Sequence, residues 1–150
     1  AVALARHNAK LNNLESTFIH RHNSKKYFPD YLTSQIVMSD VNPRAVALAR
    51  HNAKLNNLES TFCYCDDGFS AVVANTFGAI LCNPPIRAGN EVMMRMFVNA
   101  LRCLKVEGNL FAVIRTAQGA KSWQKRLKVL FDNCEMMEIK KGYRVLRCQK

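Results

Sequence analysis

Glycine is scarce in this chain and comes late. The sequence has 150 residues and 6 glycines, and the first glycine is Gly68. Only glycine lets backbone N–H groups approach a ligand closely in a tight turn after a strand. No Gly-x-Gly turn can therefore precede Asp40, where the first recognisable strand of the chain ends.

Long apolar runs are also missing. No run approaches the roughly 20 residues of a membrane span. The apolar opening at 1–5 has no basic region before it and meets Arg6 and His7 at once, so it is not a secretory signal. We therefore expect a cytoplasmic protein without a membrane partner.

Paired metal ligands are absent as well. The six cysteines are scattered among apolar positions, without a Cys-x-x-Cys pair. We interpret them as reduced, mostly buried thiols and expect neither disulfides nor zinc. The histidines of His20-Arg21-His22 have no further ligands at suitable spacing, so we expect them on the surface and expect no metal site.

Acidic residues are few: 11 Asp and Glu stand against 22 Lys and Arg, which gives a net charge of +11. Residues 115–150 hold ten Lys or Arg against three acids, a net +7. A basic carboxyl-terminal third predicts an anionic partner, with nucleic acid as the first choice and a solvated helix face as the alternative. Trp123 lies in this basic stretch, where it either packs in the core or stacks on a base.

An exact repeat dominates the first part of the chain. Residues 1–18 recur without change at 45–62. A structural repeat keeps its pattern while its surface residues drift, so an unchanged copy indicates duplication or rearrangement. We expect 1–24 to be a displaced duplicate and 25–150 to be a single domain. The chain does not begin with Met, and Ala1 opens an uncapped helical pattern, which suggests a fragment or a processed or rearranged chain.

The rest of the chain alternates between strand and helix patterns. The patterns predict strands at 35–39, 60–65, 77–82, 109–114, 135–139 and 143–148, and helices at 43–56, 88–104 and 120–131. Gly108 is expected to break the chain before the strand at 109–114. In the second helix Val92, Met96, Val98, Leu101 and Leu104 are the core candidates. The order predicts an α/β domain, a doubly wound and mostly parallel sheet with helices on both faces.

The sequence Asn83-Pro84-Pro85-Ile86-Arg87 follows an apolar strand pattern. Two prolines cannot continue a strand, because each lacks an N–H and has its φ fixed. The chain must leave the sheet as a stiff loop at the carboxyl end of the strand, where open α/β sheets bind ligands. The Asn83 amide and the Pro84 carbonyl would then be rigid acceptors for a planar amino group. The alternative is an ordinary turn.

Carboxylates end two other predicted strands. Asp40 follows the strand at 35–39, and its two oxygens suit two adjacent hydroxyls of a ribose. Helix capping is the alternative for Asp40. Asp66 and Asp67 end the strand at 60–65, where a carboxylate could accept a hydrogen bond from an adenine amino group, or where both could be turn residues.

These residues carry a family resemblance. Residues from about 25 to 150 resemble the small-domain class I methyltransferases that use S-adenosylmethionine, and among them the ribosomal RNA guanine-N2 methyltransferases. The matching stretches are SDVNPRA at 39–45, NPPIRAG at 83–89, QGA at 118–120 and KGYRVL at 141–146. Adenine and glutamine methyltransferases share Asn-Pro-Pro, and the Ile-Arg that follows favours guanine.

The resemblance implies S-adenosylmethionine-dependent methyl transfer to the N2 amine of a guanine in ribosomal RNA. It assigns Asp40 to the cofactor ribose, an acid at 66–67 to the adenine, and Asn83 to both cofactor and amine. Pro84 would receive the amine together with Asn83. By the same resemblance Pro85 and Ile86 pack on the target base. Arg87 contacts a phosphate or a base edge, or is simply solvated.

The chain departs from the family at its amino end, where the first strand and its Gly-rich turn are missing. That strand is normally central, between the strands at 35–39 and 78–82. Either Thr17 to His20 substitute for it, or the sheet has a gap and the fold is incomplete. We expect weak or absent S-adenosylmethionine binding. The alternative function is a catalytically silent RNA-binding module, a pseudo-enzyme of the same fold.

Overall fold

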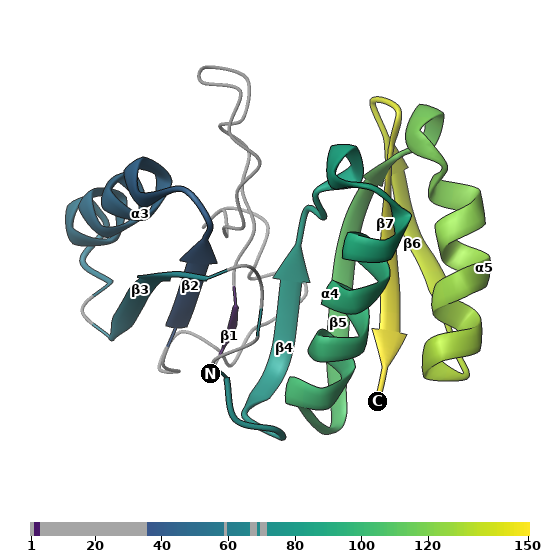
Figure 1. Cartoon of the computed structure of the whole chain (residues 1–150), viewed down its shortest axis with the longest axis horizontal. Coiled ribbons are helices and arrows are strands. Elements are labelled where there is room, and N and C mark those ends of the chain that lie inside the picture. Colours follow the sequence, from purple (N-terminus) through teal and green to yellow (C-terminus); the bar gives the residue numbers. More distant parts are fainter. Residues whose placement is uncertain (1, 4–35, 59, 67–68, 70–71) are drawn as a thin grey trace.

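A computed structural model describes residues 2–3, 36–58, 60–66, 69 and 72–150 (Figure 1). These residues form one sheet of seven strands in the order β3-β2-β1-β4-β5-β7-β6. The strands are β1 (Val2–Ala3), β2 (Ile36–Asp40), β3 (Thr61–Cys65), β4 (Phe77–Cys82), β5 (Leu104–Arg115), β6 (Glu135–Lys140) and β7 (Tyr143–Gln149). The strands from β3 to β5 are parallel, and β7 is antiparallel to both of its neighbours.

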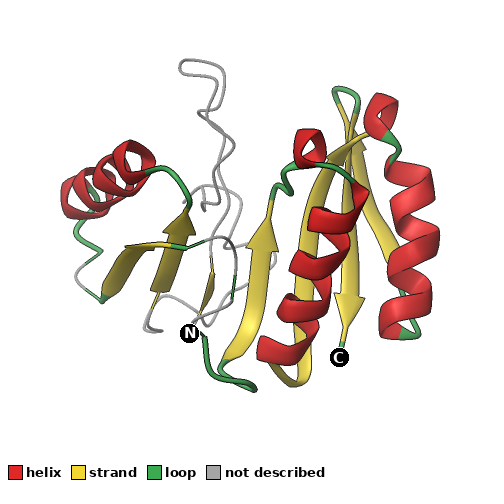
Figure 2. Ribbon diagram, in the orientation of Figure 1, coloured by secondary structure: helices red, strands yellow, loops and turns green. Residues whose placement is uncertain are grey.

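Three α-helices connect these strands (Figure 2). They are α3 (Pro43–Leu55), α4 (Asn90–Cys103) and α5 (Ala120–Phe131), with short 3₁₀ turns η2 (Ile86–Ala88) and η3 (Thr116–Gln118). The connection β2-α3-β3 moves outward in one direction along the sheet, and β4-α4-β5 moves in the other. Because such crossovers are right-handed, α3 and α4 cover opposite faces, as in the predicted doubly wound fold.

The main core lies between the sheet and the pair α4 and α5. The rings of Phe97 and Trp123 lie 5.5 Å apart, between these two helices. Trp123 is buried, so its predicted place in the core is confirmed. Of the predicted core candidates, Leu104 is buried, and Met96 and Leu101 are partly buried against the core, whereas Val98 was predicted wrongly, because it is 47% exposed. The face that packs is Met93, Phe97, Ala100 and Cys103.

The sequence at α3 shows how local signals decide a fold. Asn42 caps this helix, with its side-chain oxygen accepting the Arg44 N–H at 2.9 Å, and Pro43 occupies the first turn. The Val-Ala pair at 46–47 is therefore helical. The identical pair at 2–3 forms strand β1.

Strand β1 closes the centre of the sheet. Val2 pairs with Ile36 of β2 on one side and with Ala79 of β4 on the other. The predicted alternative of a gap is therefore wrong, because a two-residue strand occupies that place and pairs with residues 36–37 of β2 and 79–80 of β4. Thr17 to His20, the other predicted substitute, lie outside the described residues.

The predicted break at Gly108 is also wrong, because β5 runs through it. Phe77 is paired with Leu104 and Ala79 with Asn109, so the register shifts there, and Glu107 has a φ of +62°. A β-carbon at Gly108 would lie 2.8 Å from the Lys105 carbonyl oxygen and 3.1 Å from that of Phe77. Glycine here allows a close backbone approach at a bulge and does not end a strand.

Six cysteines have free thiols. Cys82, Cys103 and Cys148 are buried, Cys63 and Cys134 are half-buried, and Cys65 is exposed. Within the described residues no three or more His, Cys, Asp or Glu side chains gather as a metal site would require. His20 and His22 lie outside those residues. Among the helices that the structure describes, none is long and apolar enough to cross a membrane.

Candidate active site

The residues singled out after three strands lie at the carboxyl edge of the parallel strands, toward which the arrowheads of β2 and β4 point in Figure 1. Val2 pairs with both Ile36 and Ala79, which puts these two residues at the same level. Four residues further along each strand, Asp40 and Asn83 are then level with each other. Two strand spacings separate them by about 10 Å.

Asp40 is a buried carboxylate with one oxygen in use. The side chain is 7% exposed, and Oδ1 accepts the Asn42 N–H at 2.8 Å. Oδ2 is buried and has no hydrogen-bond partner among the described residues. Burial raises the pKa of Asp40, and the hydrogen bond from Asn42 opposes that rise. A buried acceptor without a donor is costly, so this oxygen suits a ligand hydroxyl.

Asp66 lies beside Asp40, directly after β3. Its backbone N–H donates to the Asp40 carbonyl oxygen at 3.3 Å, and Cys65 pairs with Asp40 across the sheet. The structure thus brings Asp40 and Asp66 together, as predicted from their positions at strand ends. Asp67 lies outside the described residues.

The loop after β4 is built from two successive turns. The Ile86 N–H donates to the Pro84 carbonyl oxygen at 2.9 Å, and the Ala88 N–H donates to that of Pro85, also at 2.9 Å. Pro85 has φ −77° and ψ 75°, the values of an inverse γ-turn. The Pro84 carbonyl is therefore fixed in direction, and its second lone pair can accept one more hydrogen bond.

Asn83 precedes these turns and is half-buried. Within the described part of the chain its side chain makes no hydrogen bond. Pro84 behind it is buried, and Gly89 ends the loop with a φ of +97°, a value that glycine adopts easily. The loop therefore places a half-buried amide side chain next to a carbonyl of fixed direction, and their role as acceptors for an amine stays a prediction.

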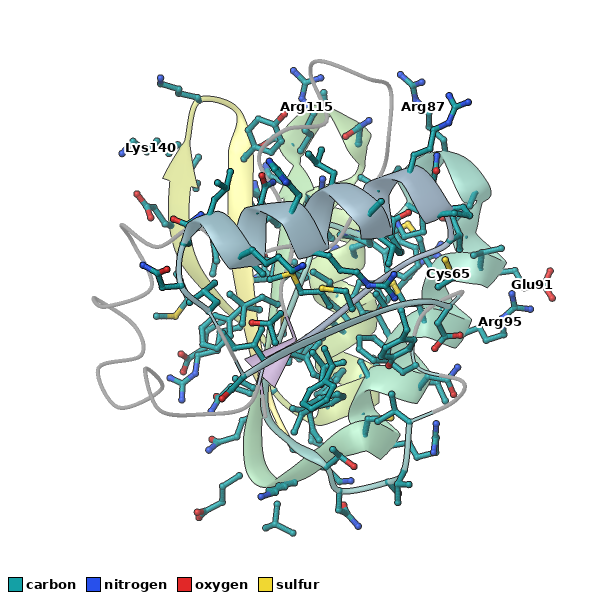
Figure 3. The ribbon with its side chains drawn as sticks, turned by 90° about the vertical axis from the view of Figure 1, so that its left-hand side faces the viewer. Cys65, Arg87, Glu91, Arg95, Arg115 and Lys140 are labelled. Carbon is teal, nitrogen blue, oxygen red and sulfur yellow. The ribbon has the colours of Figure 1, made fainter. Side chains whose placement is uncertain are left out.

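The next residues of the loop differ in exposure. Pro85 and Ile86 are half-buried, and Ile86 packs against the main core. Arg87 is exposed and points away from the sheet edge (Figure 3). Their contacts with a substrate base or phosphate stay predictions.

Sequence reasoning missed Arg115, which ends β5 at the same edge. Its guanidinium carbon lies 5.2 Å from the centre of the Tyr143 ring, and the two residues are paired across β5 and β7. The matching stretch at 141–146 contains Tyr143, but only the pairing of β5 with β7 shows that it meets Arg115.

The residues from 28 to 147 match the family described as the methyltransferase small domain. The chain belongs to this family. The match covers the described site residues from Asp40 to Arg87 and also Arg115.

Two curated relatives of this chain of the methyltransferase small-domain family show how far the likeness extends. The uncharacterized protein YbxB of Bacillus subtilis is 42% identical over 122 residues, 81% of this chain and 61% of YbxB. Ribosomal RNA large subunit methyltransferase G of Pectobacterium atrosepticum is 36% identical over 89 residues, 57% of this chain and 23% of that protein. The chain thus spans about three fifths of the first relative and about a quarter of the second.

Solved methyltransferase structures share the fold. The T. thermophilus 16S rRNA N2 G1207 methyltransferase, RsmC, in complex with AdoMet and guanosine, superposes with a TM-score of 0.61 at 16% identity, over 77% of this chain and 29% of that one. A methyltransferase from Pyrococcus furiosus superposes with a TM-score of 0.65 at 18% identity, over 84% of this chain and 66% of that one. At these identities the likeness shows the fold, and it confirms the predicted Rossmann-like α/β class.

Proposed function

We propose that this chain transfers a methyl group from S-adenosylmethionine to the exocyclic N2 amine of a guanine in ribosomal RNA. The observation that carries the proposal is the placement of Asp40 and Asn83. A buried carboxylate with one oxygen lacking a described partner stands level with a half-buried amide, about 10 Å away at the ligand-binding edge of the sheet. The two residues are the two halves of one site.

The described residues fit the ribose and adenine end of S-adenosylmethionine. The Oδ2 atom of Asp40 can accept a hydrogen bond from a ribose hydroxyl, since no described residue donates to it. Asp66 and Asp67 follow the neighbouring strand and would accept from the adenine amino group. The methionine end lacks a Gly-x-Gly turn, because the first glycine of the chain is Gly68. We therefore expect weak cofactor binding.

Bound at this edge, the cofactor would supply a sulfonium methyl group that a nitrogen lone pair can attack. The lone pair of a guanine N2 is delocalised into its ring, which makes the amine a poor nucleophile. The Asn83 side-chain oxygen and the free lone pair of the Pro84 carbonyl accept its two hydrogens and favour a pyramidal nitrogen. The transfer would form the N–C bond as the S–CH3 bond breaks and S-adenosylhomocysteine leaves. The methylated nitrogen is cationic and acidic and would lose one proton to water, so positioning and electrostatics do most of the work and no strong base is required.

A base inside a helix cannot reach Asn83, so the target guanine must be unstacked or flipped. The exposed parts of Pro85 and Ile86 would pack on it, and Arg87 would contact a phosphate. The choice of guanine N2 draws support from Ile86-Arg87 in the loop. The name of RsmC and the ribosomal RNA methyltransferase among the relatives agree with this substrate class. A protein with this substrate works in the cytoplasm.

The second candidate function is a catalytically silent RNA-binding module. The absence of a Gly-x-Gly turn before Asp40 favours it, whereas the intact acceptor loop at 83–89 favours the enzyme. The two candidates share the RNA partner and differ in methyl transfer.

A methyl-transfer assay separates them. Ribosomal RNA is incubated with labelled S-adenosylmethionine at a concentration well above its dissociation constant, and incorporation is compared between wild type and Asn83→Ala. We expect incorporation by wild type and a loss of about a hundredfold or more in the variant, the size of effect seen when one preorganised polar group is removed. Equal incorporation by both proteins would sink the role of Asn83. No incorporation by either would favour the silent module.

A further inference from the structure

Three exposed cations stand at the carboxyl edge of the sheet beside the Asn83 loop. Arg87 lies in η2 after β4, Arg115 ends β5, and Lys140 ends β6. Figure 3 shows all three along the same end of the molecule, with their side chains directed away from the ribbon. We call these three residues the cationic rim.

The register of the last strands fixes the spacing of the rim. Tyr143 of β7 pairs with Arg115 on one side and with Lys140 on the other. Arg115 and Lys140 are therefore level and about two strand spacings, roughly 10 Å, apart. The rim thus runs from the loop after β4 across the ends of β5, β7 and β6.

The surroundings of the rim within the described residues hold one of its side chains in place and do not neutralise its charge. The Tyr143 ring lies under the Arg115 guanidinium at 5.2 Å, which holds that side chain at the edge. In the described part of the chain no carboxylate forms an ion pair with Arg87, Arg115 or Lys140. The ion pair found there, between Arg147 and Glu135 at 3.8 Å, lies further along the β6–β7 hairpin.

We propose that the cationic rim binds the phosphates of the RNA segment that flanks the target base. The inference rests on the proposed function, since it places the RNA backbone beside the loop that would receive the guanine. Guanidinium and ammonium groups in a row suit a polyanion. S-adenosylmethionine carries no phosphate, so the rim has no partner in the cofactor. Tyr143 is a positioning residue that orients Arg115.

The test compares two variants that lose the same charge. The rim variant carries Arg87→Gln, Arg115→Gln and Lys140→Gln. The control variant carries Lys54→Gln, Lys105→Gln and Lys128→Gln. These three lysines are exposed at the last turns of α3 and α5 and at the start of β5, the opposite edge of the sheet.

The measurement is the dissociation constant for a single-stranded ribosomal RNA fragment at several salt concentrations. We expect the rim variant to bind at least tenfold more weakly near 0.1 M salt. Its log–log salt slope should fall by about 2, because three phosphate contacts on a single strand account for roughly 0.7 each. The control variant should change less than threefold. Equal losses of RNA affinity in both variants would overturn the proposed role of the cationic rim. If double-stranded DNA binds as tightly as the RNA, and the rim variant loses the same affinity for both, the assignment of the cationic rim to RNA is overturned.

Asn83→Ala separates the rim from the proposed function. We expect this variant to lose methyl transfer by about a hundredfold or more, whereas RNA affinity is compared between the rim and control variants. If methyl transfer depends on Asn83 but the rim and control variants bind RNA equally well, the proposed RNA contact of the rim is wrong and the proposed function is kept. If wild type transfers no methyl group but the rim variant alone loses RNA affinity, the catalytic proposal falls and the rim stands.

Tyr143 is tested by two further substitutions. Tyr143→Phe keeps the ring under Arg115, whereas Tyr143→Leu removes it and keeps an apolar side chain. We expect Tyr143→Leu to weaken RNA binding by about threefold, the size of an exposed cation–π contact, and Tyr143→Phe to restore it. Wild-type affinity in both variants, or equal losses in both, would overturn the positioning role.

Discussion

Asp40 is expected to lower the stability of the fold while it serves the proposed cofactor site. Its buried Oδ2 has no partner among the described residues, and burial raises its pKa. We expect Asp40→Asn to raise the free energy of unfolding at pH 7 by on the order of 1 kcal/mol, because a buried charge is removed while an oxygen still accepts the Asn42 N–H. Urea denaturation measures this gain.

The pH dependence of that gain gives a second readout. The folded-state pKa of Asp40 is raised, so the folded state holds this proton more tightly than the unfolded chain does. Asp40 therefore costs stability above its folded pKa, and the cost declines as the pH falls below that pKa and is gone once the pH is below the ordinary carboxyl pKa of the unfolded chain. The advantage of Asp40→Asn should vanish there too. A loss of stability in the variant at pH 7 would contradict this account.

The same substitution should weaken cofactor binding. An ionised acceptor for a ribose hydroxyl contributes about 1.5–3 kcal/mol, so we expect a loss of tenfold or more in S-adenosylmethionine affinity. Calorimetric titration of the two proteins tests it. Unchanged affinity would remove Asp40 from the ribose site.

Among the elements, α3 depends on one cap. Asn42→Ala removes the side-chain acceptor of the Arg44 N–H and leaves the backbone donor to Asp40 in place. We expect a loss of about 1 kcal/mol in the free energy of unfolding, with Asn42→Ser within a few tenths of wild type. Denaturant titration of the three proteins tests the cap, and an equal loss for Ala and Ser would contradict it.

Strand β5 depends on Gly108. Gly108→Ala places a β-carbon against two backbone carbonyl oxygens that cannot move independently of the sheet, and we expect it to cost about 1–3 kcal/mol. The neighbouring change Glu107→Gly is the control. It relieves a φ of +62° and should not destabilise the fold. Thermal melts distinguish the two, and a neutral Gly108→Ala would refute the close approach.

Local signals explain which elements were predictable. Asn42 and Pro43 predict the start of α3, and the prolines after Cys82 predict the end of β4. The positions of Asp40 and Asn83 at the carboxyl edge of the sheet therefore followed from the sequence. The identity of β1 did not, because its Val-Ala pair is helical in the second copy. Arg115 was missed for a related reason. Its partner Tyr143 meets it only through the pairing of β5 with β7, which no local pattern reveals.

At the scale of the whole molecule, the chain has the fold of its family but lacks a glycine-rich turn after β1. The sheet has all seven strands, yet β1 has two described residues and no glycine lies between it and β2. We therefore expect S-adenosylmethionine to bind with a dissociation constant weaker than micromolar. Calorimetric titration of the full chain measures it, and micromolar affinity would refute the expected weakness.

The central claim is that Asp40 and Asn83 are two halves of one site that methylates guanine N2. Mass spectrometry of nucleosides from ribosomal RNA, incubated with the full chain and saturating S-adenosylmethionine, tests it most directly. We expect N2-methylguanosine with wild type and none above background with Asn83→Ala. A methylated product at another atom, or equal N2-methylguanosine from both proteins, would contradict the claim.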